Sequence, residues 1–176
     1  IAFGIFASKF VSDYFSSDLT SLFLAMSILF VLLPDIDILW YKRYDKIDHR
    51  GFMHYPLLYT IVSLALLATV GVEIASLFFV STMFHFIHDT FILGWGVTWF
   101  APFSLRRYKL FPDNGKGGFL KEKYMTWLPS EQGELEQKLD DKHWIKNWYG
   151  KVTVISVVEY SSFSIAILWL VYHFYM

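Results

Sequence analysis

Long apolar segments constrain the fold of this chain more than any other feature of its sequence. There are five such segments, and each contains no more than three charged or histidine residues. They are Ile1–Val11, Leu19–Leu33, Tyr55–Val72, Ile74–Leu93 and Val152–Met176. A helix needs about 20 residues to cross roughly 30 Å of hydrocarbon. The pattern predicts an all-α fold, a multi-pass transmembrane helical bundle of four to five helices, in which the first segment is the end of a helix that begins upstream.

The composition also favours a membrane protein. Hydrophobic residues make up 55% and charged residues 18% of the 176 residues, and the mean hydropathy is +0.40. Soluble proteins average about 45–50% apolar and about 25% charged residues. The net charge of −1 gives no reason to expect nucleic acid as a partner. The absence of cysteine excludes disulfide scaffolds and thiolate chemistry, so any metal must be bound by His, Asp or Glu.

Two polar stretches interrupt the apolar segments and set the predicted orientation. Of fifteen Lys and Arg residues, four lie in 38–54 and ten in 104–151. Cytoplasmic loops carry the excess of basic residues, so we expect both stretches on the cytoplasmic side of the inner membrane. The predicted single domain has three parts: a membrane core with the candidate site at 1–104, a polar cytoplasmic insert at 105–151 and a last transmembrane helix at 152–176. Within the insert, Glu131–Lys146 has the pattern of an amphipathic helix.

Ionisable residues at the ends of the apolar segments mark a candidate site. A charged group inside a bilayer costs about 2.5–3.5 kcal/mol on insertion scales, so such groups usually have a function. Three motifs stand out, namely LPDID at 33–37, HRGFMH at 49–54 and HFIHD at 85–89. His85 and Asp89 are four residues apart, so both project from one helix face. The predicted topology brings all three motifs to the cytoplasmic ends of the helices, where we expect them to meet.

The residue types in these motifs favour a metal site. Mixed imidazole and carboxylate donors suit Zn, Mn or Fe better than Ca or Mg, and their number allows one or two divalent ions. Two ions would favour phosphoester hydrolysis. Simpler interpretations remain open for single residues. Asp35 follows a proline and could form a turn, Glu159 could pair with Lys151 or a hydroxyl, and His88 could lie beside a ligand without binding metal itself.

Together with Gly96-Val97 and Pro102-Phe103-Ser104, the three motifs resemble the LexA-binding, inner-membrane-associated metal-dependent hydrolase family over residues 1–104. This resemblance implies a small multi-pass membrane protein with a metal-dependent hydrolase site. The ligands that it implies are Asp35, Asp37, His49, His54, His85 and Asp89, with Arg50 and Gly51 as part of the same motif. The chain departs from the family pattern at Ile38, Met53 and Tyr55, and a histidine that family members carry before the first helix would lie upstream of Ile1.

These observations predict a hydrolase that acts on a phosphoester or similar bond at the cytoplasmic membrane face. Asp37 or Asp89 would orient or deprotonate the attacking water. Arg50 would bind a substrate phosphate, because its planar guanidinium matches two oxygens. We expect membrane lipids around the helices, a lipid-linked or phosphorylated substrate, and a protein partner for the insert at 104–151.

Two other functions are compatible with the same sequence. A non-catalytic membrane subunit or scaffold of a larger complex would use the His/Asp cluster as a structural metal site. Such a site is saturated with protein ligands, whereas a catalytic site keeps an open position and a channel to it. A transporter with an intramembrane proton relay is less favoured, because the sequence has no inverted repeat and its polar groups lie at one face.

Overall fold

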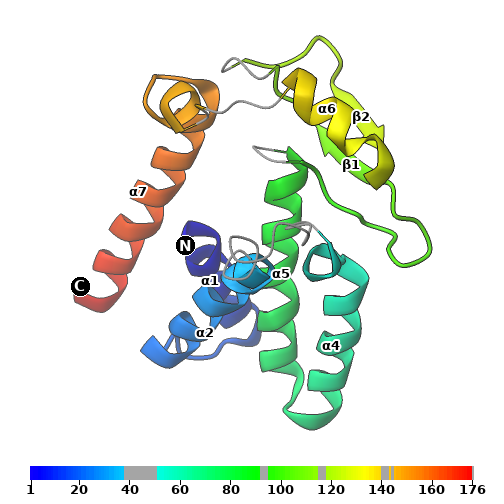
Figure 1. Cartoon of the computed structure of the whole chain (residues 1–176). Coiled ribbons are helices and arrows are strands. Elements are labelled where there is room, and N and C mark those ends of the chain that lie inside the picture. The colour runs from blue at the N-terminus through cyan, green and yellow to red at the C-terminus, as the bar shows by residue number, and fades with distance from the viewer. Residues whose placement is uncertain (38–50, 92–94, 115–117, 140–142, 144, 176) are drawn as a thin grey trace.

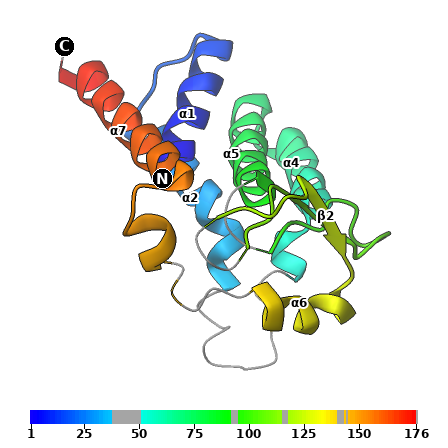
Figure 2. The same ribbon diagram turned by 90° about the horizontal axis from the view of Figure 1, so that it is seen from above.

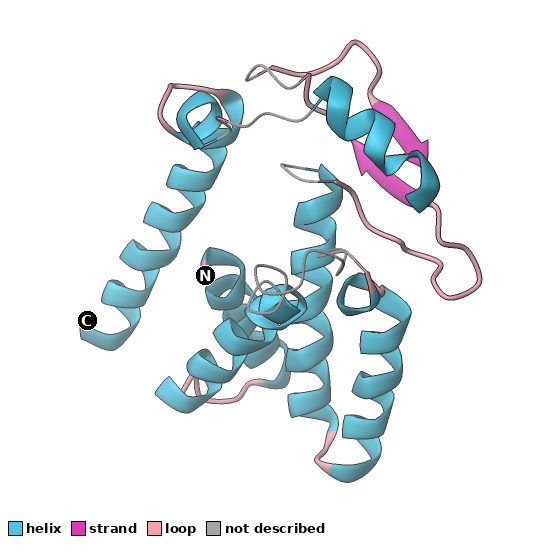
Figure 3. Cartoon of the chain, in the orientation of Figure 1, coloured by secondary structure: helices cyan, strands magenta, loops and turns pink. Residues whose placement is uncertain are grey.

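The computed structural model is mostly helical, with one small sheet (Figure 1, Figure 3). It describes residues 1–37, 51–91, 95–114, 118–139, 143 and 145–175. The helical core consists of α1 (Ala2–Phe15), α2 (Ser21–Leu32), a 3₁₀ turn at Leu33–Asp37, a second at Phe52–His54, α4 (Pro56–Thr69) and α5 (Val72–Phe91). The remaining elements are β1 (Arg107–Leu110), β2 (Tyr124–Trp127), a 3₁₀ turn at Pro129–Glu131, α6 (Gln132–Leu139), a π-helical turn at Ile145–Tyr149 and α7 (Val154–Tyr175).

Helix α5 is the centre of the core and packs against α1, α2 and α4 (Figure 2). Hydroxyl groups and small residues join these helices. Ser27 donates a hydrogen bond to the carbonyl of Gly4 at 2.7 Å, and its hydroxyl lies 2.9 Å from that of Ser81. A Cβ atom on Gly4 would lie 2.8 Å from the Cα of Ile28, so α1 and α2 approach too closely for a larger residue. Such contacts are typical of helices that associate in membranes.

The core helices run in alternating directions and bring their polar ends to one side. The C-terminal ends of α2 and α5 lie beside the start of α4 and the starts of α1 and α7, and the turn between α4 and α5 lies at the opposite end of these two helices (Figure 1). The sequence motifs at these ends therefore face one another. This is the arrangement that the predicted topology requires.

Among the described residues, two helices are long and apolar enough to cross a membrane, namely α5 and α7. Helix α4 is apolar but has 14 residues, which corresponds to about 21 Å. Helices α1 and α2 have 14 and 12 residues. The predicted multi-pass bundle is therefore not established by helix length. Large apolar side chains are nevertheless exposed on α4 and α7, including Leu64 at 61% and Leu168 at 69%, as expected of a surface that binds lipid or another protein.

The insert differs from the all-α prediction because it contains a two-stranded sheet. Strands β1 and β2 are antiparallel, with Arg107 opposite Trp127 and Leu110 opposite Tyr124. Of the amphipathic helix predicted over Glu131–Lys146, the structure describes α6 and the π-helical turn that begins at Ile145. Residues 140–142 and 144 of this prediction lie outside the described residues.

Gly96 and Val97 attach this hairpin to the core. Val97 and Tyr108 exchange two backbone hydrogen bonds, at 3.0 and 3.1 Å. Gly96 has a φ of +68°, and a Cβ there would lie 2.6 Å from the carbonyl oxygen of Tyr108. Only glycine tolerates both the positive φ and this close approach. The hairpin therefore packs against the C-terminal end of α5.

Candidate metal centre

The LPDID motif places two carboxylates directly after α2. Thr20 caps the start of this helix by accepting a hydrogen bond from the amide of Phe23 at 3.2 Å, as threonine commonly does. At the other end Pro34 has no amide hydrogen and does not favour a continuing α-helix. The chain tightens there into the 3₁₀ turn that carries Asp35 and Asp37. Asp35 of this turn lies 3.7 Å from His85 of α5, and Asp37 lies beside His54.

The second motif contributes His54, which ends a 3₁₀ turn just before α4. Pro56 occupies the first turn of α4, where its missing amide hydrogen is not needed. The carbonyl of His54 accepts a hydrogen bond from the hydroxyl of Thr98 at 3.1 Å. Its ring packs against those of His85 and Phe86, with centroid separations of 5.5 and 6.2 Å. The side chain is fully buried, so its position is fixed on all sides.

Four side chains from these segments converge on one point. His54 Nε2 lies 3.5 Å from Asp35 Oδ1 and 3.7 Å from Asp89 Oδ2. His85 Nε2 lies 3.7 Å from each of the same two oxygens. Ligand atoms of Asp35, His54 and His85 all lie within 4.8 Å of one another. Ligand atoms around a tetrahedral zinc ion, at about 2.0–2.2 Å from it, are roughly 3.4 Å apart. Donor types and spacing thus fit a metal ion.

Asp37 lies behind His54 and not beside the other donors. Its Oδ2 is 4.0 Å from His54 Nδ1, the ring nitrogen that faces away from Asp35 and Asp89. The side chain is buried, with 7% exposure. A carboxylate behind a metal-binding imidazole orients the ring and increases its basicity. The geometry therefore favours an orienting role for Asp37 over the direct ligation predicted from the sequence.

The surroundings of Asp35 favour its charged form. Burial raises the pKa of Asp35. The hydrogen bond with His54 and the nearby charge of His85 lower this pKa by more than burial raises it, so the net pKa lies below its ordinary value. Carboxylates bind metal ions in their deprotonated form. Asp35 therefore stays deprotonated to a lower pH than an ordinary aspartate.

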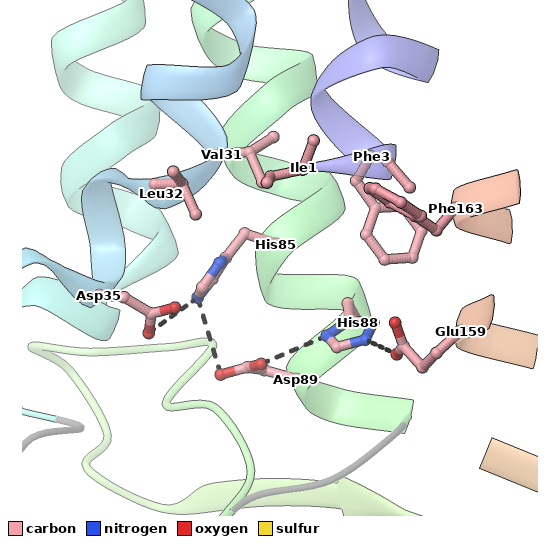
Figure 4. Close-up of a pocket in the computed structure, with 11 residues that line it drawn as sticks. Ile1, Phe3, Val31, Leu32, Asp35, His85, His88, Asp89, Glu159 and Phe163 are labelled. Carbon is pink, nitrogen blue, oxygen red and sulfur yellow. Dashed lines mark hydrogen bonds and ion pairs between the residues drawn. The ribbon is translucent and has the colours of Figure 1, made fainter. Parts of the chain in front are cut away.

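His88 connects the cluster to α7 (Figure 4). Its Nδ1 lies 3.6 Å from Asp89 Oδ1, and its Nε2 is hydrogen-bonded to Glu159 Oε1. The pairing of Glu159 with Lys151 or a hydroxyl, expected from the sequence, is wrong. Lys151 instead donates to Asn147 at 3.0 Å. His88 lies beside the predicted ligand Asp89, in line with the interpretation that it supports the site without binding the metal.

A cavity of about 350 Å³ opens beside the cluster and reaches three of the four converging side chains. One side of this cavity is polar, and the other is apolar (Figure 4). The polar side consists of Asp35, His85, His88, Asp89 and Glu159, and the apolar side includes Phe3, Val31, Leu32 and Phe163. A small molecule in this cavity would contact the cluster directly. That access is a property of catalytic sites more than of closed structural ones.

The structure adds Lys109, which the sequence analysis did not single out. Strand β1 buries this residue to 1% exposure, and its Nζ donates a hydrogen bond to the carbonyl of Asp89 at 3.2 Å. Asp89 lies in the last turn of α5, where carbonyls lack helical partners and a positive charge is favourable. A lysine in a charged insert is usually exposed. Alternate residues of a strand face the same side, and Arg107 and Lys109 share the buried side of β1. This alternation is the one sequence signal that could have indicated the burial of Lys109.

Two predicted site residues, His49 and Arg50, lie outside the described residues. Gly51 is described, and it directly precedes the 3₁₀ turn that carries His54. The metal-binding role predicted for His49 and the phosphate-binding role predicted for Arg50 stay predictions. The described residues supply enough donors for one ion.

In the comparison with protein families, residues 1–172 match the family described as the YdjM inner membrane protein. No curated protein and no solved structure matches the chain. The family match extends past residues 1–104, on which the resemblance in the sequence rested, and includes the insert and most of α7. It supports the inner-membrane part of that resemblance and does not address LexA binding or hydrolysis.

Proposed function

The chain belongs to the YdjM inner membrane protein family, and we propose that it is a metal-dependent hydrolase. It would cleave a phosphoester or similar bond at the cytoplasmic face of the inner membrane. The observation that carries this proposal is the convergence of Asp35, His54, His85 and Asp89 beside a cavity that reaches three of them.

The donor set suits zinc, and manganese or iron are compatible with it. When bound, the ion supplies Lewis-acid activation of water and of the scissile group. His54 and His85 direct Nε2 towards the same two carboxylate oxygens. The other ring nitrogen of His54, Nδ1, then faces the carboxylate of Asp37, which would orient the ring.

The remaining residues have roles that follow from their contacts. Asp89 lies along the cavity, where its carboxylate would orient or deprotonate the attacking water. His88, held by Glu159, fixes the other oxygen of Asp89. Lys109 fixes its backbone. Arg50 would bind the substrate phosphate, as predicted from the sequence.

We also propose that the site and the insert face the cytoplasm. Ten of the fifteen basic residues lie in 104–151, and basic residues concentrate in cytoplasmic segments. Helices α5 and α7 would cross the bilayer, and the shorter α1, α2 and α4 would cross beside them with local thinning of the bilayer. Lipids would contact the exposed apolar faces of α4 and α7, and the insert would be available to a protein partner.

A structural metal site in a non-catalytic membrane subunit is the alternative. Asp35, His54 and His85, with Asp89 as a fourth donor, equal in number the ligands of a tetrahedral ion, which favours this function. The adjoining cavity favours catalysis. Measuring hydrolysis and bound metal in the same preparation therefore distinguishes the two functions.

The test uses the full chain, purified in detergent and loaded with zinc or manganese. We expect it to hydrolyse p-nitrophenyl phosphate or bis(p-nitrophenyl) phosphate, to lose this activity with a chelator and to regain it with metal. Asp89→Asn should lower turnover per bound ion by roughly 10²–10⁴-fold, whereas Glu134→Gln on the exposed face of α6 should not. Stoichiometric metal without turnover of either compound would contradict the hydrolase and favour the structural site.

A further inference from the structure

We propose that the substrate is an amphiphile, with a phosphate-bearing head group on the polar side of the cavity and an apolar chain on the other side. This inference rests on the proposed hydrolase function of the same site and specifies the substrate class. Hydrolysis would add the hydroxyl of water to phosphorus, break the phosphorus–oxygen bond and pass the proton of water to the leaving alcohol. No other reactant is needed.

The division of the cavity into two sides is the first observation. Its ionisable residues come from the 3₁₀ turn after α2, from α5 and from Glu159 of α7, and they adjoin the metal-binding cluster. Its apolar residues lie on the other side (Figure 4). Val31 and Leu32 come from the last turn of α2 and Phe163 from α7, one turn after Glu159. A ligand that fills the whole cavity must therefore be polar at one end and apolar at the other.

The size and chemistry of the apolar side favour an alkyl chain over a wholly polar substrate. A volume of about 350 Å³ is in the range of small-molecule sites, about 300–1,000 Å³. Each buried CH₂ group contributes about 0.8 kcal/mol. An inorganic or sugar phosphate would leave Leu32 and Phe163 in contact with water, whereas an alkyl chain would cover them.

The packing of α7 provides a route from the bilayer to this cavity. Helix α7 packs mainly against α1 and contacts α5 through the hydrogen bond between His88 and Glu159. Its outer surface is apolar and exposed, with Val158 at 45% and Val157 at 51%. These residues lie next to the wall that Glu159 and Phe163 contribute. A lipid beside α7 could therefore place its head group at the metal cluster while its chain stays in apolar surroundings.

The test compares the binding of two phosphates of equal charge, dodecyl phosphate and methyl phosphate, to the metal-loaded full chain in detergent micelles by titration calorimetry. We expect dodecyl phosphate to bind at least tenfold more tightly. Leu32→Trp should fill the apolar side and remove this preference while leaving the affinity for methyl phosphate unchanged. Leu29→Trp is the matched control, because Leu29 is exposed on the same helix and outside the cavity lining.

Phe163→Ala is a second variant in case Leu32→Trp does not fold, and it should also reduce the preference for the longer chain. Metal content checks that each variant retains the cluster. The amphiphile proposal would be overturned if the wild-type chain bound both phosphates with equal affinity, or if Leu32→Trp lowered the affinity for both phosphates equally. Either result would overturn it even if p-nitrophenyl phosphate is hydrolysed. A preference for the longer chain without hydrolysis of any phosphoester would support the amphiphile site and overturn the hydrolase.

Discussion

The two sides of α5 near its C-terminal end are built differently. On one side, short 3₁₀ turns bury Asp37 beside His54, and His54 packs against His85. On the other side, His88 and Glu159 keep 21% and 24% of their side chains exposed next to the cavity. A metal site needs donors held in fixed geometry, whereas a ligand site needs space and access. The closed side is thus suited to hold an ion and the open side to admit a reactant.

The largest expected effect is on the closed side. His54→Ala removes a fully buried donor. Loss of a residue that only supports a metal ligand already lowers metal affinity by about 10–100-fold, so we expect the affinity for zinc to fall by roughly 100-fold or more. Competition with a chromophoric chelator measures this affinity. His143→Ala is the control, because His143 is exposed. Equal zinc affinities of the two variants would show that the closed side does not hold the ion.

The next effect concerns Lys109, which supports the end of α5 shared by both sides. Lys109→Met keeps much of the side-chain volume but leaves the carbonyl of Asp89 without this hydrogen bond. Loss of a buried partner costs about 1–3 kcal/mol, so the melting temperature should fall by roughly 2–12 °C for a chain of this size. Thermal unfolding in detergent tests this, with Lys138→Met on exposed α6 as the control. Equal melting temperatures of both variants would contradict a structural role for Lys109.

The smallest effect is expected on the open side. Glu159→Gln keeps the size of the side chain but weakens its charge-assisted hydrogen bond with His88. Because His88 supports Asp89 from outside the cluster, zinc affinity should fall by no more than about tenfold, and the ion should still bind. The same chelator competition applies. A loss as large as that of His54→Ala would make Glu159 a ligand and remove the distinction between the two sides.

The sequence predicted the long helices and the meeting of the motifs because both depend on local patterns. The apolar segments at 74–93 and 152–176 correspond to α5 and α7, with ends that agree within two residues. The four-residue spacing of His85 and Asp89 fixes their common face in any α-helix. The alternating directions of successive helices then bring the ends of α2 and α5 together without any knowledge of side-chain packing.

The features that were missed depend on contacts between distant residues. Strands β1 and β2 are separated by 13 residues, so no short hairpin turn marks them. His88 and Glu159 are 71 residues apart, and the sequence offers no reason to pair them. The inward position of Lys109 depends on how the hairpin packs on α5.

The donors of the candidate metal centre come from three separate segments, at residues 35, 54 and 85–89. An unfolded chain would not hold these donors at a common distance, so an ion would bind the folded state selectively. Free zinc at 100 times its dissociation constant would then add about 2.7 kcal/mol to the free energy of unfolding. The abundance of the intact protein in a cell would consequently follow the supply of the metal.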